Sequence, residues 1–278
     1  MPAADTALLL RHLRFLTSLR PFRNHKHPES LDRTADYIAA AFRRAGLPTG
    51  MQAWEVRGHT YRNVLGSINP GAARRLIVGA HYDVYKDTEG ADDNASSVAG
   101  LLELARLLAG KEGMFSHGID LVAFSLEEPP FFKTEFMGSA IHARSIAESS
   151  TDVMGMLSLE MLGFYGSPGH ERQGEKFLMV SGIQRFDAFN QKISELLRAA
   201  GQGFGSRAWS RADGDKNNGP SDHRNFWPLG IPAAMVIGTG GGPNPHYHRA
   251  SDTLGTLDVE ALAKAVNAVA YTVKHFTP

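Results

Sequence analysis

The spacing of apolar residues along the chain switches between a helical period and continuous apolar runs. Leucines at helical spacing predict a helix near Leu8–Leu19, and a second such stretch, followed by Gly46, predicts one over about Ser30–Ala45. Apolar runs bounded by Gly, Pro or acidic residues predict strands at Met51–Val56, Tyr61–Ile68, Arg75–Ala80, Ile119–Ser125, Val153–Glu160, Lys176–Val180 and Pro232–Ile237. The helical period returns at Asn94–Ala109, Gly138–Ala147, Phe186–Ala199 and Val259–Phe276, the last preceded by Asp258 as a cap.

This order of elements predicts the fold class. Apolar strands that alternate with amphipathic helices indicate an α/β protein with a mainly parallel sheet covered on both faces. The sequence shows no internal repeat and no low-complexity linker, and the Gly- and Asp-rich stretch Gly201–Pro220 is expected to be a surface loop. We therefore expect a single domain over residues 1–278.

Composition excludes several classes of function. The 29 basic and 29 acidic residues balance, which argues against a nucleic-acid or anionic-membrane partner. Because the chain has no cysteine, any metal must be held by His, Asp or Glu. Arg11 and His12 interrupt the only apolar run near the N-terminus, and no run approaches the roughly 18 residues of a membrane span. The expectation from the chain as given is a cytoplasmic location.

Metal-binding residue types cluster where predicted strands end, which is where α/β sheets carry their sites. They are His81 and Asp83, Glu127 and Glu128, Glu160, and His246 and His248. Asp92, Asp93 and Asn94 precede a predicted helix.

Each feature alone has a structural explanation. The residues before the helix favour an N-cap, although one of them could cap while its neighbour binds metal. The H-x-D pair could be a hydrogen-bonded loop, or a metal ligand with the acceptor that fixes its tautomer. The two adjacent glutamates could be a solvated strand end, or a ligand beside a general base. Glu160 between apolar residues needs a cation if it is buried.

The order Ser221-Asp222-His223 invites comparison with a serine triad. Neighbouring residues do not form a triad by adjacency, and the chain lacks a G-x-S-x-G elbow, so a helix cap is favoured here.

Taken in chain order, these clusters resemble the dizinc aminopeptidases of peptidase family M28. The matching segments are GAHYD (79–83), GADDNAS (90–96), SLEE (125–128), LSLEMLG (157–163), SDHRNF (221–226) and HRASDT (248–253). The resemblance implies a zinc-exopeptidase (phosphorylase/hydrolase-like) fold: a three-layer α/β domain with a mixed, mostly parallel central sheet flanked by helices.

The resemblance also implies a ligand set for two zinc ions. His81 and Glu160 would bind one ion, Glu128 and His248 the other, and Asp92 would bridge both. Cobalt or manganese would also suit such nitrogen and oxygen ligands.

Three further roles complete the expected mechanism. Glu127 would be the general base for a water held between the two ions, and Asp83 would orient His81. Tyr247, next to a ligand histidine, is a candidate oxyanion donor, with plain packing as the alternative.

The function implied is an aminopeptidase that acts on peptides with a free N-terminus. One alternative is a glutaminyl-peptide cyclotransferase, which would hold a single zinc through Asp92, Glu128 and His248. An alternative of another class is a non-catalytic binding protein with the same fold. The chain departs from many relatives by having Glu rather than Asp at position 160 and by a bulky segment over Pro129–Phe136, expected to reshape the substrate pocket.

Overall fold

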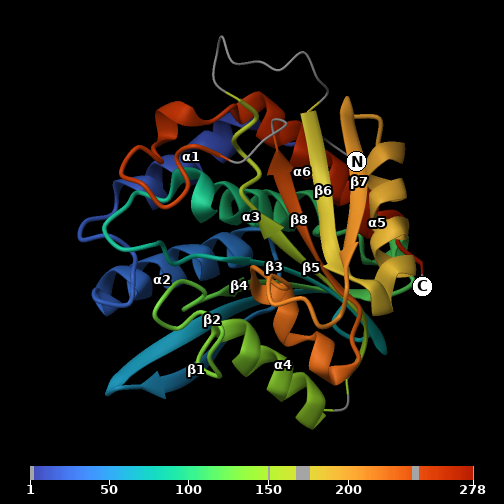
Figure 1. Cartoon of the computed structure of the whole chain (residues 1–278), viewed down its shortest axis with the longest axis horizontal. Helices are drawn as coiled ribbons and strands as arrows, with labels where there is room; N and C mark the ends of the chain where they lie inside the picture. The colour runs from blue at the N-terminus through green and yellow to red at the C-terminus, as the bar shows by residue number, and fades with distance from the viewer. Residues whose placement is uncertain (1–2, 150, 167–175, 240–243, 278) are drawn as a thin grey trace.

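One mixed β-sheet runs through the computed structural model, which describes residues 3–149, 151–166, 176–239 and 244–277 (Figure 1). The strand order across the sheet is β1-β2-β4-β3-β5-β8-β6-β7. The strands are β1 (Thr49–Val56), β2 (His59–Ile68), β3 (Arg74–His81), β4 (Gly118–Phe124), β5 (Asp152–Glu160), β6 (Lys176–Ile183), β7 (Phe204–Arg211) and β8 (Ala233–Thr239).

Four of the strand pairings are parallel and three are antiparallel. The central strands β4, β3, β5 and β8 run parallel to one another, and β6 pairs in parallel with β7. The β1–β2 hairpin, the β2–β4 pair and the β8–β6 pair are antiparallel. The prediction of a mixed, mostly parallel sheet is confirmed.

Helices cover both faces of this sheet. Contacts with the strands place α2, α3 and α5 on one face, with α1 and α6 packed against them. The other face is contacted by α4 and by the short helical segment η4 (Asp222–Asn225). The α-helices are α1 (Thr6–Ser18), α2 (Pro28–Arg44), α3 (Ser97–Leu108), α4 (Gly138–Ser149), α5 (Asp187–Ala199) and α6 (Val259–His275).

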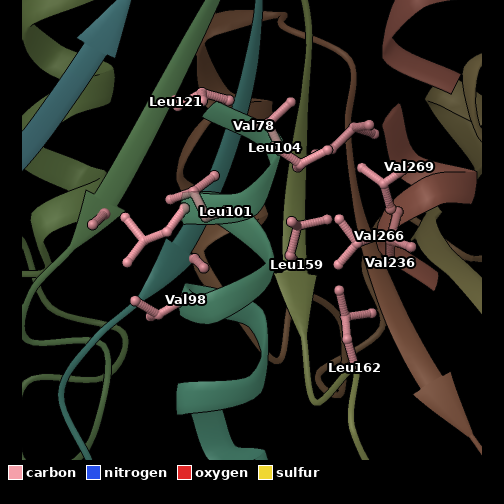
Figure 2. Packing of buried hydrophobic residues seen from close by; sticks show 14 of the residues in the cluster. Val78, Val98, Leu101, Leu104, Leu121, Leu159, Leu162, Val236, Val266 and Val269 are labelled. Atoms are coloured by element: carbon pink, nitrogen blue, oxygen red, sulfur yellow. The ribbon is translucent and has the colours of Figure 1, made fainter. Parts of the chain in front are cut away.

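Alternation along the strands sends side chains to two separate cores. On β3, Leu76 and Val78 join the larger core with α3 and α6, whereas Ile77 joins the smaller core on the α4 face. Figure 2 shows the larger core, where Val236 of β8 and Val266 of α6 lie near one another. Because both faces of the central strands are buried, they read as continuous apolar runs in the sequence.

The predicted helices and strands are found with ends shifted by a few residues, and Asp258 caps α6 by accepting from the N–H of Ala261. One prediction is wrong: Gly201–Pro220 is not a loop throughout, because Phe204–Arg211 forms β7. This strand lies at the sheet edge and is rich in polar residues, so it lacks the apolar run that marks the inner strands. Within the described residues, no helix is both long and apolar enough to cross a membrane.

Candidate metal centre

The carboxyl ends of three adjacent parallel strands meet at one place in the fold. His81 is the last residue of β3, Glu160 is the last residue of β5, and Glu127 and Glu128 follow β4. Since β3 lies between β4 and β5, their side chains gather around the end of β3. His248 joins them from the segment that follows β8. The predicted convergence of strand-end residues is present.

Asp93 lies at the middle of this cluster. Its Oδ1 is 3.4 Å from His81 Nε2, and its Oδ2 is 3.2 Å from His248 Nε2. Each imidazole also faces a second carboxylate, with His81 Nε2 3.6 Å from Glu160 Oε2 and His248 Nε2 3.2 Å from Glu128 Oε2. Three groups in the described residues could hold a metal, and the two that contain His81 with Glu160 and Glu128 with His248 share Asp93. The third group is His81 with Glu127 and Glu128.

The prediction that Asp92 bridges the two groups is corrected by this geometry. The carboxylate of Asp92 instead accepts hydrogen bonds from the Gly163 N–H (2.9 Å) and the Asn244 amide (2.8 Å). The segment η1 (Ala91–Ser96) departs from helical geometry at Asp93, whose φ and ψ are −105° and 87°, so the side chains of the two aspartates have different surroundings. The alternative of a simple cap also fails, because α3 begins at Ser97 with Ser96 as its N-cap residue.

Two buried aspartates hold the backbone of the two acidic pairs. The carboxylate of Asp83 accepts from the N–H groups of Glu127 (3.1 Å) and Glu128 (3.0 Å), and its Oδ1 lies 3.4 Å from His81 Nδ1. His81 Nδ1 is also 3.2 Å from the backbone carbonyl oxygen of Asp83. That the Asp83 carboxylate orients His81 stays a prediction.

Asp252 does the same for the other pair. It accepts from the N–H groups of Asp92 (2.8 Å) and Asp93 (3.1 Å). Sequence reasoning did not single out Asp252, although it lies inside the quoted segment HRASDT. A hydrogen bond between residues 160 positions apart leaves no local signal in the sequence.

Two further residues hold Glu160 in place, a role that the sequence analysis did not predict for them. Asn94 donates to the Leu159 carbonyl (3.0 Å) and accepts from the Met161 N–H (3.1 Å), so it holds the backbone on both sides of Glu160. Ser221 donates its hydroxyl hydrogen bond to Glu160 Oε1. Ser221 is thus neither a nucleophile in a triad nor a side-chain cap of η4.

The electrostatics of the cluster favour a bound cation. Burial raises the pKa of Glu128 to about 7, with the Asp93 charge adding to the effect. Burial likewise raises the pKa of Glu127 well above its usual range. Burial lowers the pKa of His248, but contact with Asp93 and Glu128 outweighs it and raises the pKa to about 9. Buried carboxylates in this number are costly without a positive partner.

Two buried oxygen atoms point to the same conclusion. Within the described part of the chain, Asp93 Oδ2 and Glu128 Oε1 accept no hydrogen bond. Buried polar atoms without a partner are uncommon, and a bound ion is one recognised explanation. Both atoms belong to the group that includes His248, so the donors fit a divalent metal.

A cavity of about 270 Å³ opens onto the cluster. Its lining comprises His81, Asp93, Glu127, Glu128, Glu160, Met161, Pro220, Met235, Ile237, Asn244, Tyr247 and His248. Tyr247 is 50% exposed, and its ring stacks on His248 at a centroid distance of 3.8 Å. The ring of Tyr85 also stacks on the His248 imidazole, at a centroid distance of 4.0 Å. The packing alternative for Tyr247 is present, and its hydroxyl role stays a prediction.

Two other sequence features lie apart from this cavity. His246 Nδ1 is 3.0 Å from the Ser251 hydroxyl, and His246 belongs to none of the three metal-holding groups among the described residues. The segment Pro129–Phe136 contributes no residue to the described cavity lining. Its Phe131 packs near Tyr61 of the β1–β2 hairpin, and the effect of this segment on the substrate pocket stays a prediction.

Comparison with known proteins gives a family match over most of the chain. Residues 63–273 match the model of peptidase family M28. The uncharacterised protein YfbL of Escherichia coli is 35% identical, and the alignment covers 96% of this chain and 87% of YfbL. Two further relatives, named as an aminopeptidase and a probable leucine aminopeptidase, are 26% identical, and the chain spans about half their length (43% and 52%).

Solved structures share the fold. A leucine aminopeptidase precursor from Bacteroides thetaiotaomicron superposes with a TM-score of 0.78 at 20% identity, with 99% of both chains covered. A glutaminyl cyclase from the same organism superposes with a TM-score of 0.79 at 20% identity, again over 99% of both chains. At this identity the likeness establishes a zinc-exopeptidase-like fold, which both activities use.

Proposed function

The chain belongs to peptidase family M28, and from that premise we propose that it is a metal-dependent aminopeptidase that hydrolyses the N-terminal bond of peptides. The observation that carries the proposal is the position of Asp93, which faces His81 with one carboxylate oxygen and His248 with the other. A second carboxylate beside each imidazole completes two groups, Glu160 with His81 and Glu128 with His248. This arrangement supports a pair of ions rather than a single one.

The residues present fit two zinc ions, and cobalt or manganese would suit the same donors. His81, Asp93 and Glu160 would hold one ion, and Asp93, Glu128 and His248 the other. When bound, such ions lower the pKa of a water molecule and polarise a carbonyl oxygen.

Glu127 is the group best placed to move protons. It is buried beside the cluster, with its Oε2 3.9 Å from His81 Nε2, and it lines the cavity. Its carboxylate would accept a proton from the attacking water and deliver it to the amine that leaves. Asp83 would hold the backbone of Glu127 in place through the hydrogen bond that it accepts from the Glu127 N–H.

Tyr247 would serve as the donor to the developing oxyanion. Burial, together with the charge of Asp93, raises the pKa of Tyr247, so the phenol keeps its proton at neutral pH. Its position on the cavity wall, stacked against His248, supports the role.

Charge supports an exopeptidase. Asp93, Glu128, Glu160 and Glu127 supply four negative charges, which balance two divalent ions before the hydroxide that attacks is counted. The surplus charge would attract the α-ammonium of a peptide. An amine held near Glu127 and Glu160 would place the first carbonyl over the cluster, where positioning contributes most to the rate.

The test combines metal analysis with a peptide panel. Chelation should abolish hydrolysis, zinc should restore it at two ions per chain, and acetylation of the peptide amine should remove activity. Full activity after verified metal removal would contradict the proposal. One ion per chain with cyclisation of N-terminal glutamine would identify a cyclotransferase instead, and metal binding without turnover of any peptide would indicate a binding protein.

A further inference from the structure

A second cavity of about 600 Å³ continues from the first along the same face of the sheet. The two cavities share Met161, Pro220, Met235, Ile237 and Asn244. The larger one lies over β8, β6 and β7, which Figure 1 shows side by side at one end of the sheet. A ligand held at the metal cluster can therefore extend into the larger cavity without leaving the protein surface.

Strand register defines the direction of this path. Glu160 of β5 pairs with Ile237 of β8, Ile237 pairs with Met179 of β6, and Met179 pairs with Arg207 of β7. Residues paired in this way project from the same face of a sheet. The row crosses three strand spacings, so about 14 Å separate the backbone at Glu160 from that at Arg207.

The two ends of this row carry opposite charge. The smaller cavity is lined by four carboxylates, whereas the described lining of the larger cavity contains two arginines and no carboxylate. Arg211 is balanced by Asp215 at 3.2 Å, and its guanidinium lies 4.4 Å from the Trp209 ring centroid. The guanidinium of Arg207 lies 5.2 Å from the ring centroid of Phe177 and lines the cavity.

Apolar side chains occupy the middle of the row. Ile237 and Met179 separate the acidic end from Arg207, and Trp209 adds an aromatic ring that is 50% exposed. The surface is thus a strip with an anionic end, an apolar middle and a cationic end. A short peptide with a free amine, ordinary side chains and a carboxylate has the complementary order of charges.

We propose that the larger cavity binds a carboxylate of the peptide substrate, with Arg207 as the residue that selects it. The inference rests on the proposed function and extends it to a substrate class. An extended chain rises about 3.3 Å per residue, so a span of about 14 Å corresponds to roughly four residues. Arg207 would therefore meet the C-terminal carboxylate of a tetrapeptide, or an acidic side chain at the fourth position of a longer peptide.

The experiment compares matched peptides on the zinc-loaded full chain. Leu-Ala-Ala-Ala is offered as the free acid and as the C-terminal amide, and Leu-Ala-Ala-Glu-amide is compared with Leu-Ala-Ala-Gln-amide. A hydrogen bond between charged groups favours the carboxylate form, and solvent exposure weakens the contact, so we expect a kcat/KM about 5- to 20-fold higher for that form. The first pair of peptides tests recognition of the terminal carboxylate, and the second pair tests recognition of an acidic side chain.

Three variants assign the preference to a residue. Arg207→Gln should reduce the preference to near unity by slowing the carboxylate forms, and Arg207→Glu should reverse it. Arg74→Gln is the matched control, because it also removes the charge of an exposed arginine. Arg74 lies at the start of β3, opposite Asp152. Equal melting temperatures for the variants would show that an exposed edge-strand substitution leaves folding intact.

Equal kcat/KM for both members of both pairs would overturn this inference while leaving the aminopeptidase in place. A preference that survives in Arg207→Gln, or that follows the first side chain instead of the distant carboxylate, would also overturn it. Failure to cleave any of the four peptides would count against the proposed function, and this inference would fall with it.

Discussion

Two regions of the candidate metal centre hold a pair of acidic residues in the same way. In each, a pair of adjacent acidic residues presents its two backbone N–H groups to one buried aspartate. Asp252 holds the pair Asp92-Asp93, and Asp83 holds the pair that follows β4. A carboxylate that accepts two neighbouring N–H groups fixes the local backbone, and thereby the directions in which both side chains leave it.

The two regions differ in how many carboxylates reach the cluster. At the first pair only Asp93 does, because Asp92 is fully engaged by Gly163 and Asn244. At the second pair both Glu127 and Glu128 line the cavity. The first pair therefore supplies one candidate ligand, Asp93, and one structural residue, Asp92. In the second pair, Glu128 is the proposed ligand and Glu127 the proposed base.

The largest effect should separate the two aspartates of the first pair. Asp93→Asn replaces an oxygen that faces His248 or His81 with an amide, so we expect loss of metal and a fall in activity greater than the about 10–100-fold that loss of a supporting residue costs. Asp92→Asn should keep two ions per chain. Metal analysis by mass spectrometry reads both variants. Metal loss in Asp92→Asn with retention in Asp93→Asn would reverse the assignment made from the geometry.

Substitutions in the second pair should cause two different defects, one in turnover and one in metal binding. Glu127→Gln removes a proton acceptor, so turnover should fall about 10²–10⁴-fold while two ions remain bound. Glu128→Gln should instead weaken metal binding, because its oxygen faces His248 at 3.2 Å. Turnover measured at saturating zinc distinguishes the two. If Glu127→Gln lost an ion and regained near-normal activity in excess zinc, Glu127 would be a ligand and not the base.

The same comparison shows what the sequence could predict. His81, Glu128, Glu160 and His248 were predictable, because ligand-type residues at the ends of parallel strands must converge once the sheet forms. The inner strands were predictable from their apolar runs. The edge strand β7 was not, since an exposed strand with polar residues has the composition of a loop.

The choice between Asp92 and Asp93 lay beyond the sequence pattern. Both precede the same apolar helix, and the pattern predicts helical backbone up to that point. The extended conformation at Asp93 depends on distant contacts, including Asp252 and the Asn94 bonds to β5. Hydrogen bonds between distant segments decide side-chain direction here, and one sequence without its fold does not record them.

The smallest effect should distinguish the two supporting aspartates. Asp83→Asn and Asp252→Asn each replace one carboxylate oxygen by an amide that cannot accept, so one buried N–H loses its partner at a cost of about 1–3 kcal/mol in the free energy of unfolding. Asp83 Oδ1 also lies 3.4 Å from His81 Nδ1, whereas the hydrogen bonds of the Asp252 carboxylate within the described residues come from the backbone N–H groups of its pair. We therefore expect zinc affinity to fall toward 100-fold in Asp83→Asn and toward 10-fold in Asp252→Asn, the range typical of residues that support ligands.

Competition with a chromogenic chelator measures the affinity, and urea unfolding of the metal-free proteins measures the stability. Asp152→Asn serves as the control, because Asp152 is exposed and pairs only with Arg74 at the far end of β3. Equal stability losses with unequal zinc affinities would show that the contact with His81 is what sets the two regions apart. Equal zinc affinities in the two variants would mean that backbone support alone is the function of both aspartates, and that the orientation of His81 comes from elsewhere.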